Sequence, residues 1–83
     1  MEKAELGIRN VLQQHGRLNQ DVSLLDVQTD LYQLGLTSHA SVNVMLALEG
    51  LFDIEFPDHM LKRNVFSSID SIRSALTSLT STA

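Results

Sequence analysis

Apolar residues recur along the chain at every third or fourth position, which is the spacing of helices that bury one face. The first such stripe consists of Ala4, Ile8, Val11 and Leu12. It predicts a helix over residues 2–14 that stops near Gly16, a residue type suited to the position after a helix. The last stripe consists of Ile69, Ile72, Leu76 and Leu79. It predicts a helix that begins at Ser67 or Ser68, whose hydroxyls suit an N-cap.

The central stretch is strongly apolar and predicts a helix over residues 38–52. Its expected buried face consists of Val42, Met45, Leu48 and Phe52, with Val44, Leu46 and Leu51 beside it. Gly35 suits a turn just before this helix, because it takes a positive φ at no steric cost. Ser38 then lies at the junction of loop and helix, where we expect its hydroxyl to be the N-cap. A phosphate bonded to Ser38 would lie beside free N–H groups and the positive end of the helix dipole.

The segment between the first two helices, residues 17–30, is too apolar for a free linker. It should lie across the other helices and bury part of its apolar set, which consists of Val22, Leu24, Leu25 and Val27. A short turn is expected over residues 29–34, with Tyr32 half-buried and its hydroxyl reaching solvent.

A short third helix is expected over residues 57–63, because Pro57 suits a first helical position. Lys62 and Arg63 would suit its C-terminal end, and Met60 and Leu61 are its expected buried residues. Together the patterns predict an all-α, four-helix arrangement that forms a single domain from the first residue to the last.

Composition narrows the range of functions. The chain has 83 residues, no cysteine and a formal charge of −4. Without cysteine it has no thiolate nucleophile, so any thioester chemistry needs a thiol from a prosthetic group. Its six basic residues are scattered, so nucleic acid is not an expected partner. No apolar run approaches the ~18 residues of a membrane span, and we expect a cytoplasmic protein without membrane attachment.

Catalysis and metal binding are not expected. Ser38 and His39 are neighbours in a helix and therefore point in different directions, and no orienting acid or oxyanion hole is evident for a serine hydrolase. We therefore assign no catalytic residue. The three histidines, His15, His39 and His59, lie far apart and form no carboxylate–histidine motif, so no metal site is expected. On these residues alone a plain helix cap is the favoured interpretation of Ser38.

A longer pattern around Ser38 carries a family resemblance. It consists of Leu34-Gly35-Leu36-Thr37-Ser38, then Val42 to Leu48, then Glu49, then Phe52-Asp53-Ile54-Glu55-Phe56-Pro57-Asp58. From Asp30 to Leu79 the chain resembles the acyl and peptidyl carrier protein family. The resemblance implies an acyl-carrier-protein-like four-helix bundle, with three longer helices, one short helix and a long loop between helices 1 and 2.

The resemblance also implies a function. Ser38 would carry a 4′-phosphopantetheine arm, transferred from coenzyme A by a phosphopantetheinyl transferase, and the thiol of the arm would hold an acyl or aminoacyl group as a thioester. Val42, Met45 and Ile54 are candidates to border a shallow groove near the arm, although each also suits the plain core.

Two departures from the family pattern indicate a specialised member. Fatty-acid carriers usually have Asp-Ser-Leu at the attachment point, where this chain has Thr37-Ser38-His39. Their second helix is acidic, whereas residues 38–52 contain one ionised side chain, Glu49. Positions at which that family often has acids are here Ala40, Asn43 and Gly50. Weak electrostatic steering at this helix favours a dedicated partner over general fatty-acid enzymes.

A finer resemblance is to the small stand-alone aminoacyl carrier proteins. It rests on Gly35 to Ser38, Ala40 to Val42, Asp53 to Asp58, Leu61, Arg63, Phe66 and Ser68-Ile69. It implies that an ATP-dependent amino acid:carrier protein ligase, similar to the catalytic core of a class II seryl-tRNA synthetase, loads a monomeric carrier. The alternatives are a specialised acyl carrier for fatty-acid or polyketide-type metabolism, served by acyl-transferring enzymes, and a helical docking module without an arm.

Overall fold

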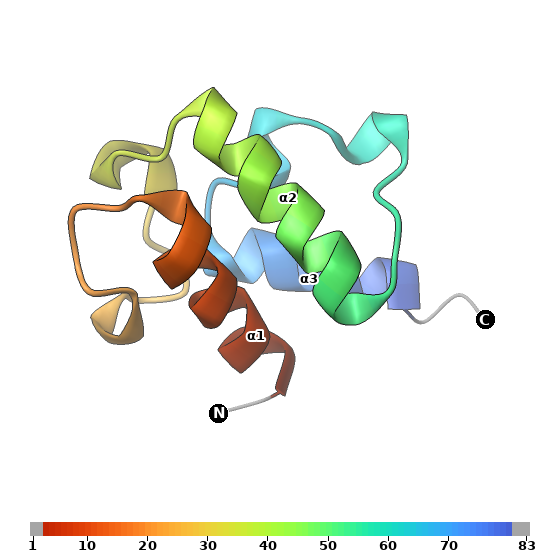
Figure 1. Cartoon of the computed structure of the whole chain (residues 1–83), viewed down its shortest axis with the longest axis horizontal. Helices are drawn as coiled ribbons and strands as arrows, with labels where there is room; N and C mark the ends of the chain where they lie inside the picture. The colour runs from red at the N-terminus through yellow and green to blue at the C-terminus, as the bar shows by residue number, and fades with distance from the viewer. Residues whose placement is uncertain (1–2, 81–83) are drawn as a thin grey trace.

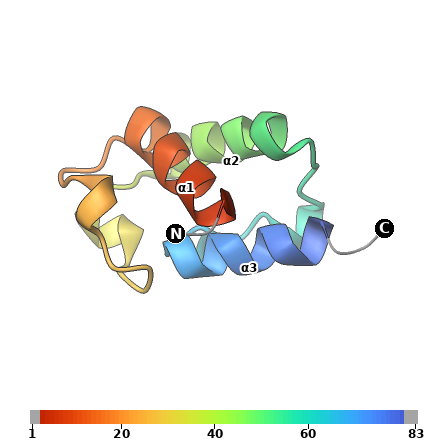
Figure 2. The ribbon, with the colours of Figure 1, turned by 90° about the horizontal axis from the view of Figure 1, so that it is seen from below.

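The computed structural model describes residues 3–80, in which three α-helices form the frame. They are α1 (Lys3–Val11), α2 (Ser38–Phe52) and α3 (Ile69–Thr80) (Figure 1). Figure 2 shows α1 and α2 in one layer, with α3 beneath them. Residues 3–80 contain no strand, so the all-α class is confirmed. Short helical turns connect the helices: η1 (Leu12–Gly16), η2 (Val22–Leu24), η3 (Leu31–Leu34), η4 (Asp58–Met60) and η5 (Arg63–Val65).

The core lies between the two layers and is apolar. Its fully buried side chains are those of Ile8, Leu12, Val22, Leu31, Val44, Leu48, Ile69, Ile72 and Leu76. Among residues 3–80 no polar or charged side chain is buried. The helix α1 comes close to α2 because Gly7 faces it, and a Cβ atom at Gly7 would lie 2.8 Å from Cζ of Phe52. A larger residue at this position would have to displace the Phe52 ring.

The first helical segment ends differently from the sequence prediction. The α-helix stops at Val11 and continues as the wider π-turn η1, which keeps Leu12 and Gly16 buried beside α2. The chain then reverses at Arg17, which has φ 54° and ψ 40°. The left-handed residue is therefore Arg17, and the prediction that Gly16 takes this position is wrong. Residue 2, the predicted start, lies outside the described residues.

The long connection between α1 and α2 packs onto the core as predicted. Val22 and Leu25 are buried, Val27 packs against the core and Leu24 is 82% exposed, so part of the apolar set is buried as predicted. On the tight turn η2, Val22 faces inward and Leu24 therefore points away. Backbone hydrogen bonds anchor the connection, and the Arg9 guanidinium donates to the Val22 carbonyl at 2.7 Å. The predicted turn before Gly35 is η3.

The helix α2 has the predicted bounds, but its buried side is turned relative to the prediction: Leu48 is buried and Met45 and Phe52 pack against the core as expected, whereas Val42 does not. Its buried residues are Ala40, Val44 and Leu48. Val42 is 49% exposed and Leu46 is 55% exposed, so the predicted inward direction of Val42 is wrong. The physical reason is that apolar residues surround most of this helix, and periodicity alone does not say which side the other helices cover.

The N-cap of α2 is Thr37 and not Ser38, which corrects the sequence prediction. Thr37 has the extended backbone of a cap, with φ −97° and ψ 165°, and its Oγ1 accepts a hydrogen bond from the Ala40 amide at 3.0 Å. Ser38 is the first helical residue. Because Thr37 caps the helix, the Ser38 hydroxyl has no capping role.

The predicted third helix is replaced by two short 3₁₀ turns, η4 and η5. Phe56 and Phe66 pack edge to face, with ring centroids 5.5 Å apart, and so hold the two ends of this segment on the core. The nine residues between them fold as two tight turns instead of one continuous helix. Met60 packs against the core, but Leu61 is 47% exposed, so its predicted burial is wrong.

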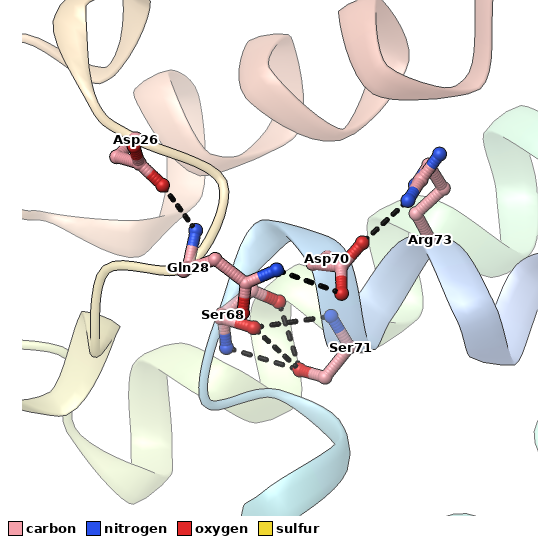
Figure 3. Close-up of polar contacts among 6 residues, drawn as sticks. All are labelled: Asp26, Gln28, Ser68, Asp70, Ser71 and Arg73. Carbon is pink, nitrogen blue, oxygen red and sulfur yellow. Dashed lines mark hydrogen bonds and ion pairs between the residues drawn. The ribbon is translucent and has the colours of Figure 1, made fainter.

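The start of α3 confirms the predicted cap at Ser68 (Figure 3). The Ser71 amide donates to Ser68 Oγ at 3.1 Å, and the Ser68 amide donates to Ser71 Oγ at 3.0 Å. Asp70 accepts hydrogen bonds from Arg73 in the same helix and from the Gln28 side chain of the long connection, the latter at 3.2 Å. This carboxylate therefore ties the connection to α3.

We predict that the tie at Asp70 is sensitive to acid. Hydrogen bonds from Arg73 first and Gln28 second hold the pKa of Asp70 below its ordinary value of 3.8. A lowered pKa in the folded chain stabilises the fold above the unfolded-state pKa, and this contribution is lost as the pH falls through the folded-state pKa. The midpoint of urea unfolding should decline below about pH 4.

In Asp70→Asn the urea midpoint should fall less steeply as the pH is lowered. Urea unfolding of wild type and variant at a series of pH values measures this difference. Asp58→Asn is the matched control, because it removes an exposed carboxylate that has no side-chain hydrogen bond within residues 3–80. Identical pH profiles for wild type and Asp70→Asn would contradict the assignment.

We also predict that the two residues at the start of α2 differ in their effect on stability. Thr37→Ala removes the cap and should lower the free energy of unfolding by about 1 kcal/mol. Ser38→Ala places a good helix former at the first helical position and should change it by no more than about 0.5 kcal/mol. Urea unfolding of the two single variants measures both effects. A larger loss in Ser38→Ala than in Thr37→Ala would mean that Ser38 is the cap.

Candidate functional site

Ser38 stands exposed at the N-terminal end of α2, held by a firmly anchored loop. Gly35 has φ 107°, a left-handed conformation that glycine adopts without strain, and it ends the turn η3. The next residue, Leu36, is 4% exposed, and its amide donates to the Leu31 carbonyl at 3.2 Å. The loop therefore has its apolar residue in the core and presents the following serine to solvent.

The Ser38 hydroxyl has no hydrogen-bond partner within the described part of the chain. The hydroxyl of Ser41, one turn further along α2, instead donates to the Ser38 carbonyl at 2.8 Å. Of these two serines on the same side of the helix, Ser38 alone has a hydroxyl that is both exposed and unused. It is thus the better placed of the two for covalent modification.

The electrostatic surroundings of Ser38 suit an attached phosphate. The first N–H groups of a helix have no acceptor within the helix, and the dipole places partial positive charge at this end. The first turn of α2 contains no acidic side chain that would oppose a negative group. A phosphate ester on Ser38 therefore fits the residues that surround it.

A groove of about 240 Å³ opens beside Ser38. It runs between α2 and the segment around η5, and Figure 1 shows this part of the α2–α3 connection next to the N-terminal end of α2. Its lining residues are Tyr32, Ser38, Ser41, Val42, Met45, Leu61, Lys62, Arg63 and Phe66. The predicted border at Val42 and Met45 is confirmed. Ile54 does not line the groove; it packs against the core.

Sequence reasoning missed six of the nine lining residues, among them Tyr32, Lys62 and Arg63. It placed Lys62 and Arg63 at the end of a helix and treated Tyr32 as a half-buried side chain. In the structure the Arg63 guanidinium carbon lies 3.9 Å from the centroid of the Tyr32 ring, so these residues close one end of the groove. The two residues are distant in the chain, and no local pattern indicates that they meet.

The structure does not bring the histidines together. His15, His39 and His59 are exposed on separate elements, and residues 3–80 contain no cluster of three potential metal ligands. Within the same residues, every helix is too short or too polar to cross a membrane.

Comparison with known proteins agrees with this geometry. Residues 15–76 match the family described as phosphopantetheine attachment site. An aminoacyl carrier protein of Agrobacterium fabrum (strain C58 / ATCC 33970) is 48% identical over 65 residues, which cover 78% of each chain.

Solved structures of carrier proteins also resemble this chain. One similar chain belongs to the crystal structure of an engineered Bradyrhizobium japonicum glycine:[carrier protein] ligase complexed with carrier protein from Agrobacterium tumefaciens and ATP. It has a TM-score of 0.88 and 41% identity, with 92% of this chain and 99% of that chain covered. In the corresponding complex with AMP the TM-score is 0.85 and the identity 42%, with 88% and 97% covered.

The matched region includes α2, the loop before it and the groove beside Ser38. It also extends over the long connection and most of α3, so the match covers most of the fold after α1 and not the serine motif alone. The chain therefore belongs to the carrier protein family that bears covalently attached 4′-phosphopantetheine, and it is a homologue of the aminoacyl carrier proteins.

Proposed function

We propose that the chain holds an aminoacyl group as a thioester on a 4′-phosphopantetheine arm attached to Ser38. The observation that carries this proposal is the exposed and unused Ser38 hydroxyl at the start of α2, inside the family match. The arm supplies a thiol, which the chain itself lacks because it has no cysteine. Loading would be carried out by a dedicated ATP-dependent amino acid:carrier protein ligase, since similar carriers are seen with such a ligase.

Attachment of the arm requires help from another protein. A phosphoester bond forms between Ser38 Oγ and the phosphorus atom on the pantetheine side of coenzyme A, the pyrophosphate bond of coenzyme A breaks, adenosine 3′,5′-bisphosphate leaves, and the hydroxyl gives up its proton to a base. No side chain within residues 3–80 hydrogen-bonds this hydroxyl. A phosphopantetheinyl transferase therefore has to supply the base, and we infer that the chain is a carrier and not itself an enzyme.

The exposed side of α2 supports a dedicated partner. It presents Val42 and Leu46, which are about half-exposed at 49% and 55%, whereas Leu51 lies on the side of the helix that faces α1. The one carboxylate of α2, Glu49, accepts a hydrogen bond from the Phe56 amide at 2.8 Å and so has an internal role. A partner would recognise this neutral face by shape and apolar contact more than by charge.

Of the three uncharged residues that stand where fatty-acid carriers often have acids, one does not lie on that face. Ala40 is 3% exposed and contributes to the core, whereas Asn43 and Gly50 are exposed. An acidic residue at position 40 would be buried without a partner, so the absence of an acid there reflects packing and not partner choice.

A specialised acyl carrier is the second candidate. The groove beside Ser38 has apolar walls at Val42, Leu61 and Phe66, which suit a short acyl chain. For either cargo we infer a cytoplasmic protein, because the proposed partners consume coenzyme A and ATP. We also infer a monomer, because the exposed apolar face of α2 is the surface that these partners would contact.

The first test is the intact mass after incubation with coenzyme A and a broad phosphopantetheinyl transferase. Wild type should gain one phosphopantetheine, and peptide mapping should locate it at Ser38. Ser38→Ala should gain nothing, whereas the matched control Ser41→Ala should be modified like wild type. Modification of Ser38→Ala would disprove the assigned serine. No mass gain with several transferases would favour a docking module without an arm.

The second test concerns the ligase. Leu46→Glu places a charge on the neutral face of α2 and should lower kcat/KM for aminoacyl loading about tenfold, equivalent to ~1.4 kcal/mol. Leu6→Glu is the matched control, because Leu6 is 50% exposed on α1. Equal effects of the two variants would show that α2 is not the docking face. Loading of a fatty acid in preference to any small amino acid would favour the second candidate.

A further inference from the structure

The groove beside Ser38 differs in charge from the chain as a whole. The chain carries a formal charge of −4, yet the groove is lined by two cationic residues, Lys62 and Arg63, and by no Asp or Glu. Neither cation forms an ion pair within the described residues. A cationic lining without an internal counter-ion leaves this site electrostatically complementary to an anion.

Arg63 is also held in place. Its guanidinium carbon lies 3.9 Å from the centroid of the Tyr32 ring, a cation–π contact between the turn η3 and the turn η5. A flat guanidinium stacked on a ring keeps its N–H groups directed sideways, where they can donate to an oxyanion. The ring thus limits the rotamers of a side chain that would otherwise be free in solvent.

We propose that Lys62 and the stacked Arg63 form a binding site for the phosphodiester of the arm on Ser38. The inference rests on the proposed function. All of these residues line the same groove, so the phosphate would lie with the end of α2 on one side and the cations on the other. Charge-assisted hydrogen bonds from Arg63 would then hold the first part of the arm along the groove.

The test uses nuclear magnetic resonance of the apo and holo forms. Attachment of the arm to wild type should shift the side-chain Nε–Hε resonance of Arg63, and about 1 M salt should reduce that shift because the Debye length falls to about 3 Å. In holo Lys62→Gln/Arg63→Gln, the ³¹P resonance should move to the position of a short modified peptide. Lys3→Gln removes a cation from α1 and should leave the ³¹P resonance unchanged.

A second pair of variants tests whether the Tyr32 ring holds Arg63 in place. Tyr32→Leu should reduce the shift of the Arg63 Nε–Hε resonance, whereas Tyr32→Phe keeps the aromatic face and should retain it. A wild-type Arg63 resonance that does not move on modification overturns the inference, and so does a ³¹P resonance that is the same in the double variant and wild type. If Ser38 is modified and Arg63 does not respond, this inference alone fails. If Ser38 is not modified, the proposed function fails with it.

Discussion

Burial of Ala40, Val44 and Leu48 fixes the rotation of α2 about its own axis, and the positions of the functional groups depend on that rotation. The close contact at Gly7 lets α1 approach α2 and cover this side of the helix. Once this side is covered, Val42 and Leu46 must face outward. The half-exposed apolar side chains on the outer side of α2 are therefore a consequence of how the core packs.

The segments outside the helices depend on the same core. Leu31 and Leu36 are buried on either side of Gly35, so the loop before α2 has little freedom and delivers Ser38 at a set place. On the other side of the groove, Phe66 is buried against Phe56 and holds the segment that carries Arg63. Two loops from distant parts of the chain are thus fixed on opposite sides of one serine.

Short sequence patterns predicted those structural features that depend on interactions between near neighbours in the chain. The bounds of α2, the cap at Ser68 and the burial of Val22 and Leu25 all follow from residue types that act on their near neighbours. The buried side of α2 did not follow, because apolar residues on several sides leave its rotation undetermined until the other helices are placed. The split of the predicted third helix into two turns depends on the Phe56–Phe66 contact, which is also tertiary. For the site, the sequence indicated Ser38 but not the cations opposite it, since Tyr32 and Arg63 meet only in the folded chain.

The use of Thr37 instead of Ser38 as the cap has a consequence for the working cycle of a carrier. A hydroxyl that held the helix together would lose that hydrogen bond each time it was esterified, and the scaffold would weaken whenever the arm was added. In the proposed function neighbouring residues divide the two tasks, so attachment of the arm to Ser38 would leave the hydrogen bond of the Thr37 cap intact. The proposed transferase and ligase would then meet the same capped helix.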